Sequence, residues 1–147
     1  MFILRILFIF FICLNISSSY ASNIKNSAVV FMYHKFGISK YPSTSVRIDQ
    51  FDEHLKEFSK AKYSVESVEF IIDTIINDGN LPENTIGISI DDADKSFYEV
   101  GWPKFKEMGF PVTLFVNTST IHENNKNYLN WDQIRELANE GVSIGAH

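Results

Sequence analysis

The chain has 147 residues, of which 45% are hydrophobic, 14% aromatic and 21% charged. This is the composition of an ordinary globular protein, and it excludes collagen-like, low-complexity and disordered chains. The formal net charge of -5 argues against a nucleic-acid-binding domain, because such domains are usually basic. The single cysteine, Cys13, excludes an internal disulfide and any zinc site built from cysteines.

The first 21 residues have the pattern of a secretory signal peptide. Arg5 gives a short basic start, and an apolar run follows it from residue 6 to residue 14. Ser19 and Ala21 are small residues two positions apart, so we expect cleavage after Ala21, with an uncleaved N-terminal anchor as the alternative. The apolar run is too short for a membrane span, which needs about 20 residues.

Removal of this segment would leave a mature chain without cysteine. An exported protein that uses no disulfide fits the periplasm or surface of a bacterium better than it fits a small disulfide-rich secreted domain. We therefore expect an exported bacterial protein, periplasmic or on the cell surface, with no stable membrane span after signal cleavage.

Beyond the signal, the hydrophobic pattern alternates between strand and helix. A continuous apolar run predicts a strand buried on both faces at 28–33. Another buried strand is expected at 85–90, and further strands are expected at 111–116 and, shorter, at 142–145. Periodic apolar residues predict helices at 49–62, 67–77, 96–108 and 130–140. The order from residue 85 onward predicts an α/β fold with a parallel sheet, either open or closed into a barrel.

The first two helices have different apolar faces. In the first, Phe51, Leu55 and Phe58 recur at helical spacing, and Asp49 can cap the first turn. The second is expected to turn five apolar side chains inward. These are Val68, Ile71, Ile72, Ile75 and Ile76.

The last two helices have well-marked ends. Gly109 follows the third helix at the position where a left-handed residue ends helices, and Gly101 and Pro103 predict an irregular first turn. The fourth helix begins with Asn130, and Gln133 stands three residues later, as a capping box requires.

Two adjacent carboxylates, Asp91 and Asp92, follow the strand at 85–90. Charges near an apolar core that also repel each other need a cation or hydrogen bonds to compensate them. The carboxyl ends of parallel strands are where α/β folds carry their chemistry. We therefore favour a metal site in which one carboxylate binds the ion and its neighbour orients or deprotonates the attacking water. The alternative is a solvated turn in which Asp94 or Ser96 caps the next helix.

A histidine, His147, follows the strand at 142–145 at the same end of the predicted sheet. Together with the two aspartates it supplies donors for zinc or a similar divalent ion, if a third ligand exists. His34 ends the first strand and is expected on the same rim in a structural or supporting role. His54 and His122 are expected at the surface.

A series of short motifs runs through residues 28–147. They are Phe31-Met-Tyr-His34, Ile88-Ser-Ile-Asp-Asp92, Lys95-Ser-Phe-Tyr98, Trp102-Pro103, the segment 109–116, Asn130-Trp131, Leu137 and Gly141-Val-Ser-Ile-Gly-Ala-His147. In order and spacing they resemble the polysaccharide deacetylase family, the NodB-like carbohydrate esterases.

The resemblance implies a distorted, incomplete (β/α) barrel, of which residues 22–147 would be the N-terminal portion. It implies that Asp91 is the general base, that Asp92 is a metal ligand and that His147 is the first histidine of the metal-binding pair. The implied reaction removes acetyl from an N-acetylated glycan to give acetate and a free amine. The implied ion is Zn²⁺, with Co²⁺ or Ni²⁺ as alternatives.

The chain departs from the family pattern at three places. Ser89-Ile90 replaces the usual Thr-Phe, and Ala93 replaces the usual Gly, so a positive φ is disfavoured there. The second histidine of the family's His-x-x-x-His motif would fall beyond His147, as would the later motifs that include the general acid. We therefore expect a chain truncated at its C-terminus that binds metal weakly and does not turn over substrate alone. A naturally short, inactive homologue is the alternative.

Two other functions fit parts of the sequence. Asp92, Asp94 and Ser96 fit the nucleophile motif of haloacid-dehalogenase-like phosphatases, in which Asp92 would be phosphorylated, Asp94 would act as acid and base, and the ion would be Mg²⁺. A catalytically inactive glycan-binding protein could stack sugars on Trp102, Trp131 or Tyr128. Both tryptophans lie in predicted helices with apolar neighbours, so core packing is the favoured role.

Overall fold

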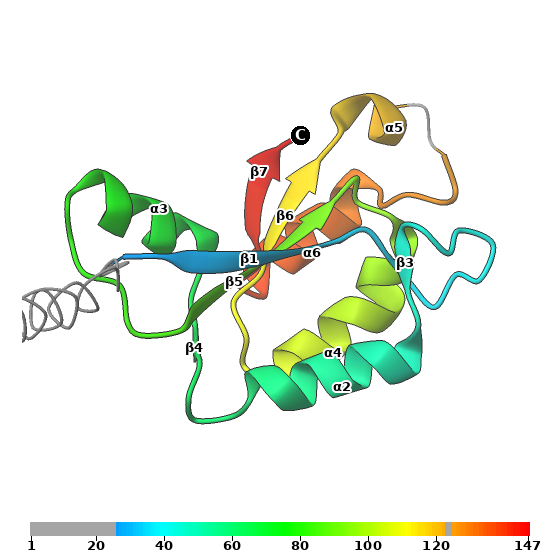
Figure 1. The fold of residues 1–147 in the computed structure, drawn as a ribbon. Coiled ribbons are helices and arrows are strands. Elements are labelled where there is room, and N and C mark those ends of the chain that lie inside the picture. The colour runs from blue at the N-terminus through cyan, green and yellow to red at the C-terminus, as the bar shows by residue number, and fades with distance from the viewer. Residues whose placement is uncertain (1–25, 123–124) are drawn as a thin grey trace, which may run out of the picture.

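The computed structural model describes residues 26–122 and 125–147. The predicted signal peptide, residues 1–21, lies outside the described residues. The centre of the molecule is a parallel sheet with the strand order β1-β5-β6-β7, in which β4 also pairs with β5 (Figure 1). Its strands are β1 (Ala28–Tyr33), β4 (Ser64–Val65), β5 (Thr85–Asp91), β6 (Thr113–Val116) and β7 (Ser143–Ala146). The predicted parallel α/β architecture is therefore confirmed.

Helices connect these strands. They are α2 (Ile48–Phe58), α3 (Val68–Ile76), the π-helical turn η1 (Phe97–Gly101), α4 (Trp102–Glu107), α5 (Thr118–His122) and α6 (Trp131–Asn139). A second, two-stranded parallel sheet pairs β2 (Lys35–Phe36) with β3 (Ser45–Val46) between β1 and α2. The sequence patterns did not predict β2, β3, β4 or α5.

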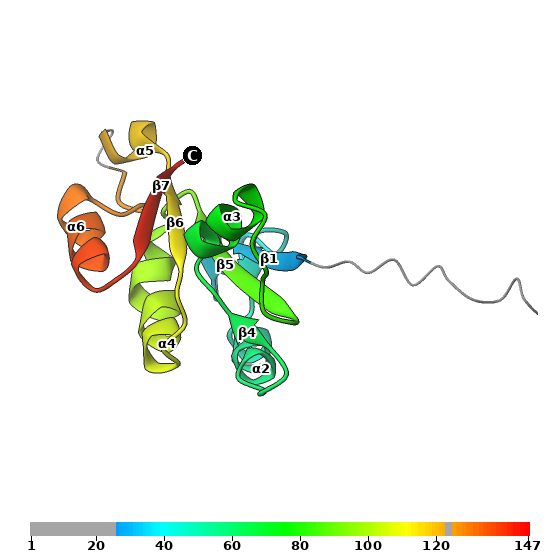
Figure 2. The ribbon, with the colours of Figure 1, turned by 90° about the vertical axis from the view of Figure 1, so that its left-hand side faces the viewer.

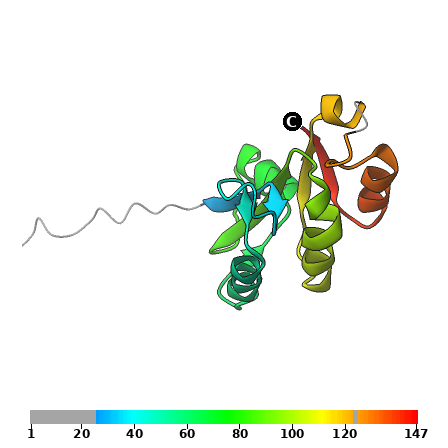
Figure 3. The ribbon, with the colours of Figure 1, turned by 90° about the vertical axis from the view of Figure 1, so that its right-hand side faces the viewer.

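Helices cover both faces of the main sheet. Helices α2 and α4 lie side by side (Figure 1), and α3 and α6 lie on opposite sides of β6 and β7 (Figures 2 and 3). Gly87 explains the close approach of α3, because a Cβ there would come within 2.9 Å of Ile71 and 3.5 Å of Val68. The glycine in β5 thus makes room for the helix.

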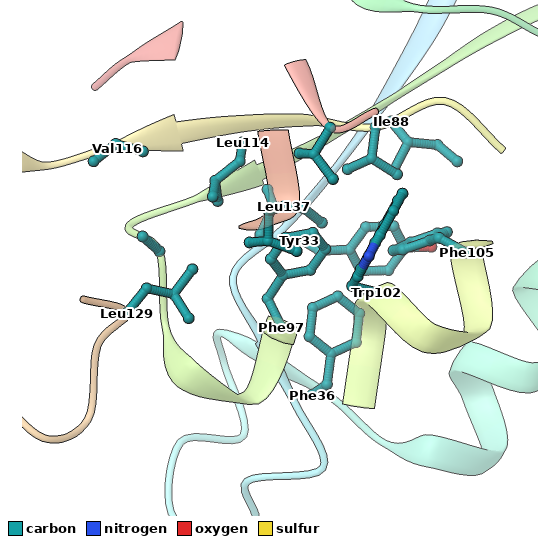
Figure 4. Packing of buried hydrophobic residues seen from close by; sticks show 14 of the residues in the cluster. Tyr33, Phe36, Ile88, Phe97, Trp102, Phe105, Leu114, Val116, Leu129 and Leu137 are labelled. Carbon is teal, nitrogen blue, oxygen red and sulfur yellow. The ribbon is translucent and has the colours of Figure 1, made fainter. Parts of the chain in front are cut away.

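The apolar core fills the space between the sheet and helices α2, α4 and α6 (Figure 4). Aromatic rings meet edge to face at its centre, with Phe51 4.8 Å from Phe36 and 5.0 Å from Phe105 between ring centroids. Such tilted pairs add stabilisation beyond the apolar area that they bury. The predicted core positions Phe51, Leu55 and Phe58 are all buried and are confirmed.

Two burial predictions are wrong. Strand β1 is not buried on both faces, because Val29 is 59% and Met32 60% exposed. Its hydrogen-bonded neighbour among the described strands is β5 alone, so β1 lies at an edge. In α3 only Val68 and Ile71 are buried, whereas the three remaining predicted core residues are exposed: Ile72, Ile75 and Ile76.

The predicted helix ends are confirmed, with one exception. Gly109 has a φ of +67° after α4, η1 provides the irregular turn, and Asn130 with Gln133 forms the complete capping box of α6. The predicted cap of α2 is wrong. The residue before that helix is Arg47, and Asp49 is bound to its guanidinium by two hydrogen bonds of 2.7 and 3.0 Å.

Candidate active site

Asp91 and Asp92 lie where β5 leaves the sheet. Asp91 is the last residue of the strand, and its side chain is 14% exposed, against 33% for Asp92. The chain then turns sharply, with φ values of +70° at Asp92 and +57° at Ala93. The expectation that Ala93 avoids a positive φ is therefore wrong. The turn keeps the left-handed geometry although alanine is less suited to it than glycine.

His147 reaches the same place from β7. The register of the sheet aligns Asp91 with Phe115 and Phe115 with Gly145, so His147 lies just beyond the row that contains Asp91. Its backbone N–H donates to the carbonyl of Val116 at 3.1 Å. The end of β7 is thereby fixed to β6.

The side chains of the three predicted residues converge. Nε2 of His147 lies 3.6 Å from Oδ2 of Asp91 and 3.8 Å from Oδ1 of Asp92. The structure therefore brings together two residues adjacent in sequence and one that follows β7, six elements further along the chain. Parallel pairing produces this meeting, because the carboxyl ends of all strands lie at one edge of the sheet.

The donor atoms of Asp92 and His147 fit a shared divalent ion. Two ligands that each bind zinc at about 2.0–2.2 Å must lie within about 4.4 Å of each other. The separation of 3.8 Å between Oδ1 and Nε2 meets that limit, and carboxylate with imidazole is a common zinc donor set. Within residues 26–122 and 125–147, no group of three or more potential ligands is arranged to hold a metal.

Asp94, by contrast, is a buried structural carboxylate. Its Oδ1 accepts hydrogen bonds from the backbone N–H of Ser96 at 2.9 Å and from the Ser96 hydroxyl at 2.6 Å. Its Oδ2 faces the ammonium of Lys35 at 3.6 Å. A group with both oxygens engaged inside the protein is poorly placed to exchange protons with a substrate.

A second segment, residues 127–129, is hydrogen-bonded to the turn. The backbone N–H of Leu129 donates to the carbonyl of Ala93 at 2.9 Å, and the N–H of Lys95 donates to the carbonyl of Asn127 at 2.9 Å. Between them, Asp94 forms an antiparallel bridge with Tyr128. The polar connection before α6 therefore braces the turn that carries the carboxylates.

The other histidines take different positions. His34 follows Tyr33, which pairs with Ile90, so it lies beside the end of β5 at the rim predicted for it. His54 is half-buried on α2, and its Nδ1 lies 2.9 Å from the Tyr33 hydroxyl, whose pKa is raised by burial. The expected surface position of His54 is therefore wrong. The side chain of His122 lies outside the described part of the chain.

The two tryptophans differ in how deeply they are buried. Trp102 is buried at 7% exposure, as predicted, and its indole N–H donates to Glu140 at 2.5 Å. Trp131 is 37% exposed at the start of α6, so its predicted core position is wrong. The first turn of α6 places it at the outside of the helix, whereas Ile134 and Leu137 face the core.

Sequence patterns missed Lys35. A lysine after a strand matches no motif, and its partner Asp94 lies in a different element. The signal that could have revealed the pair is the cost of a third carboxylate so close to Asp91 and Asp92, which calls for a nearby cation.

Among the described residues, no helix is long and apolar enough to cross a membrane.

Comparisons with known proteins find polysaccharide deacetylases both by sequence and by fold. Residues 78–147 match the family model of polysaccharide deacetylases. The chain is 27% identical over 128 residues to the poly-beta-1,6-N-acetyl-D-glucosamine N-deacetylase of Staphylococcus aureus, covering 77% of this chain and 43% of that protein. It is also 27% identical over 118 residues to YxkH of Bacillus subtilis, assigned to the polysaccharide deacetylases, covering 80% of this chain and 41% of YxkH.

Solved structures share the fold. The deacetylase PplD of Streptococcus pyogenes, in complex with acetate, has a TM-score of 0.73 and 22% identity, covering 84% of this chain and 57% of PplD. IcaB from Ammonifex degensii has a TM-score of 0.73 and 22% identity, covering 83% of this chain and 53% of IcaB. The partial (β/α)-barrel implied by the sequence is therefore confirmed.

The chain spans less than half the length of the curated relatives that it matches. Within that span the motifs, the fold and the meeting of Asp91, Asp92 and His147 all agree with the resemblance seen in the sequence. The predicted resemblance is confirmed: residues 78–147 carry the family pattern of the polysaccharide deacetylases.

Proposed function

We propose that this chain supplies the general base and two metal ligands of a metal-dependent deacetylase that acts on an N-acetylated glycan. In this proposal Asp91 is the base, and Asp92 and His147 hold a divalent ion, Zn²⁺ in the first place and Co²⁺ or Ni²⁺ as alternatives. The observation that carries the proposal is the convergence of both carboxylates on one imidazole nitrogen, at 3.6 and 3.8 Å.

The positions of the residues suit this division of roles. A divalent ion between Asp92 and His147 would supply Lewis-acid activation of water and would stabilise negative charge on the carbonyl oxygen. Asp91 is the more buried of the two carboxylates, and its Oδ2 lies beside the ligand imidazole. It can therefore take the proton of a water that attacks the acetyl carbon. Cleavage of the carbon–nitrogen bond, with a proton passed to the leaving nitrogen, then gives acetate and a free amine.

The substrate class and location are part of the proposal. The name of the Staphylococcus aureus relative specifies poly-β-1,6-N-acetyl-D-glucosamine, and the likeness to it supports a glycan of that type for this chain. Polymeric N-acetylated glycans lie outside the cytoplasm, which agrees with the proposed signal peptide at residues 1–21 and with export. The phosphatase alternative gains no support, because Asp94 is engaged by Ser96 and Lys35.

A chimera tests this proposal. This chain from residue 22 to His147 would be joined to the part of the Staphylococcus aureus relative that follows its matched segment. We expect acetate release from N-acetylglucosamine oligomers in the presence of zinc. Asp91→Asn and Asp92→Asn should each reduce the rate at least about 100-fold, since general-base catalysis alone contributes about 10²–10⁴-fold.

The matched control is Asp73→Asn, a carboxylate of the same kind that is exposed on α3. This variant should keep the rate of the unsubstituted chimera. Acetate release that survives Asp91→Asn, or that does not depend on added metal after chelation, would contradict the proposal.

A further inference from the structure

A buried charge pair beside the candidate site has no part in the proposed reaction. Lys35 in β2 and Asp94 in the β5 turn lie 3.6 Å apart, with side chains 13% and 10% exposed. We propose that Lys35, acting through Asp94, is a positioning residue: it holds the left-handed turn at Asp92 and Ala93 in the conformation that directs both carboxylates toward His147. The catalytic purpose of the turn rests on the proposed function, but the control of its conformation does not.

The turn needs an external constraint. Asp92 and Ala93 both have positive φ, at +70° and +57°, and both carry a Cβ that disfavours this region. Two consecutive left-handed residues of this kind persist only where the surrounding structure fixes them. The ladder of β5 fixes the backbone before the turn, up to Asp91. The backbone after the turn must be fixed as well.

Asp94 provides a fixed point there, in addition to the backbone hydrogen bonds that join Ala93 and Lys95 to the segment before α6. Its Oδ1 accepts from both the backbone N–H and the hydroxyl of Ser96, and its Oδ2 faces Lys35. The carboxylate is thus held at both oxygens, on one side by its own loop and on the other by a separate element. Because the pair is shielded from solvent, its attraction is screened far less than that of a surface pair.

Strand β2 contacts the turn at two points. The backbone N–H of Phe36, next to Lys35, donates to the Ser96 hydroxyl at 3.0 Å. This same hydroxyl donates to Asp94 at 2.6 Å. Strand β2 therefore holds the turn through the lysine side chain and through a backbone N–H, so the position of the carboxylates depends on a segment more than 50 residues earlier in the chain.

Four variants test the proposal in the full chain. Lys35→Met removes the cation but keeps the apolar stem, and Lys35→Arg restores the charge. The double variant Lys35→Met with Ala93→Gly relieves the strain of the turn, because glycine adopts positive φ freely. The control is Lys104→Met, which removes a lysine paired with Asp52 at 2.7 Å between α4 and α2.

The measurement is heteronuclear NMR of Asp91, Asp92 and Ala93, with φ taken from scalar couplings and backbone chemical shifts. We expect Lys35→Met to move Asp92 and Ala93 out of the left-handed region while the resonances of β6 and β7 stay in place. Lys35→Arg and the double variant should restore the turn, and Lys104→Met should not change it. An unchanged turn in Lys35→Met, whatever the loss in melting temperature, would show a merely structural pair and overturn the proposal.

A second readout connects the turn to the metal. Paramagnetic broadening by Co²⁺ at Asp92 and His147 should require at least a tenfold higher Co²⁺ concentration in Lys35→Met than in the wild type. If the wild type shows no broadening there, the proposed metal site fails while the NMR test of the turn still decides this inference. If Lys35→Met does not fold, Ser96→Ala removes the hydroxyl contacts without leaving a buried charge unpaired, and the same displacement of the turn is expected.

Discussion

At the scale of single residues, Ala93 carries the strain of the site. It is fully buried and has a φ of +57°, so its methyl group is both useful to the core and costly to the backbone. Replacement by glycine would lose about 0.8 kcal/mol of burial and gain about 1–2 kcal/mol of relief, so these terms cancel in part. The two opposing terms explain how alanine can stand where the family has glycine.

A larger side chain at this position should not be tolerated. We expect Ala93→Val to lower the free energy of unfolding by more than about 2 kcal/mol, because a β-branched residue is strained at positive φ and the buried position has no room for two more methyl groups. Chemical denaturation measures the change. Ala138→Val on the exposed side of α6 is the control and should cost less than about 1 kcal/mol. Equal effects at the two positions would contradict the strained turn.

Thr113 gives a second prediction at this scale. Its hydroxyl is buried in β6, and within the described residues it has no hydrogen-bond partner. An unsatisfied buried hydroxyl costs about 1–3 kcal/mol, so we expect Thr113→Val to raise the free energy of unfolding by about 1 kcal/mol.

The matched control is Thr85→Val. Thr85 is also a buried residue, but its hydroxyl donates to the carbonyl of Pro82 at 2.7 Å, so this variant should lose about 1 kcal/mol. Urea titrations of both variants compare them directly. If Thr113→Val were the more destabilising, the Thr113 hydroxyl would have a partner after all.

At the scale of elements, α4 and α6 are joined by charge as well as by packing. Glu140 at the end of α6 binds Lys106 at 2.7 Å and Trp102 at 2.5 Å, both from α4. Hydrogen bonds from Lys106 and then from Trp102 lower the pKa of Glu140. A carboxyl whose pKa is depressed in the folded state adds stability above its unfolded pKa and loses it as the pH falls through the folded value.

This sign gives a prediction for acid unfolding. We expect the melting temperature of Glu140→Gln to fall less steeply than that of the wild type as the pH is lowered below about 4.5, where the unfolded carboxyl begins to bind protons. Near pH 7 the variant should be the less stable of the two. Calorimetry at a series of pH values measures both effects. Glu83→Gln in the loop before β5 is the control, and parallel pH profiles for Glu140→Gln and wild type would contradict the linkage.

The same scale shows what the sequence could predict. Long apolar runs and marked caps, such as β5 and the Asn130 capping box of α6, carry their signal locally and were predicted correctly. Strands of two residues, such as β2 and β3, have no periodicity to detect. The exposure of Met32 and Ile76 depends on which neighbours cover β1 and α3, and no pattern within those segments encodes it.

At the scale of the whole molecule, the site is a product of topology. Asp91, Asp92 and His147 could be selected in the sequence because each follows a predicted strand and parallel strands share one carboxyl edge. Lys35 could not be selected, because its role depends on a contact across 59 positions of the chain. The chemistry therefore has a local signal, whereas the support that holds it in place is tertiary.

The central claim is that Asp92 and His147 share a divalent ion beside Asp91. Paramagnetic NMR of the full chain with added Co²⁺ tests it most directly, because broadening marks the site even when binding is weak. We predict that Asp91, Asp92 and His147 broaden first, and that Asp92→Asn or His147→Ala removes this effect while Asp73→Asn keeps it. Broadening spread over surface carboxylates, or unchanged in Asp92→Asn, would contradict the account.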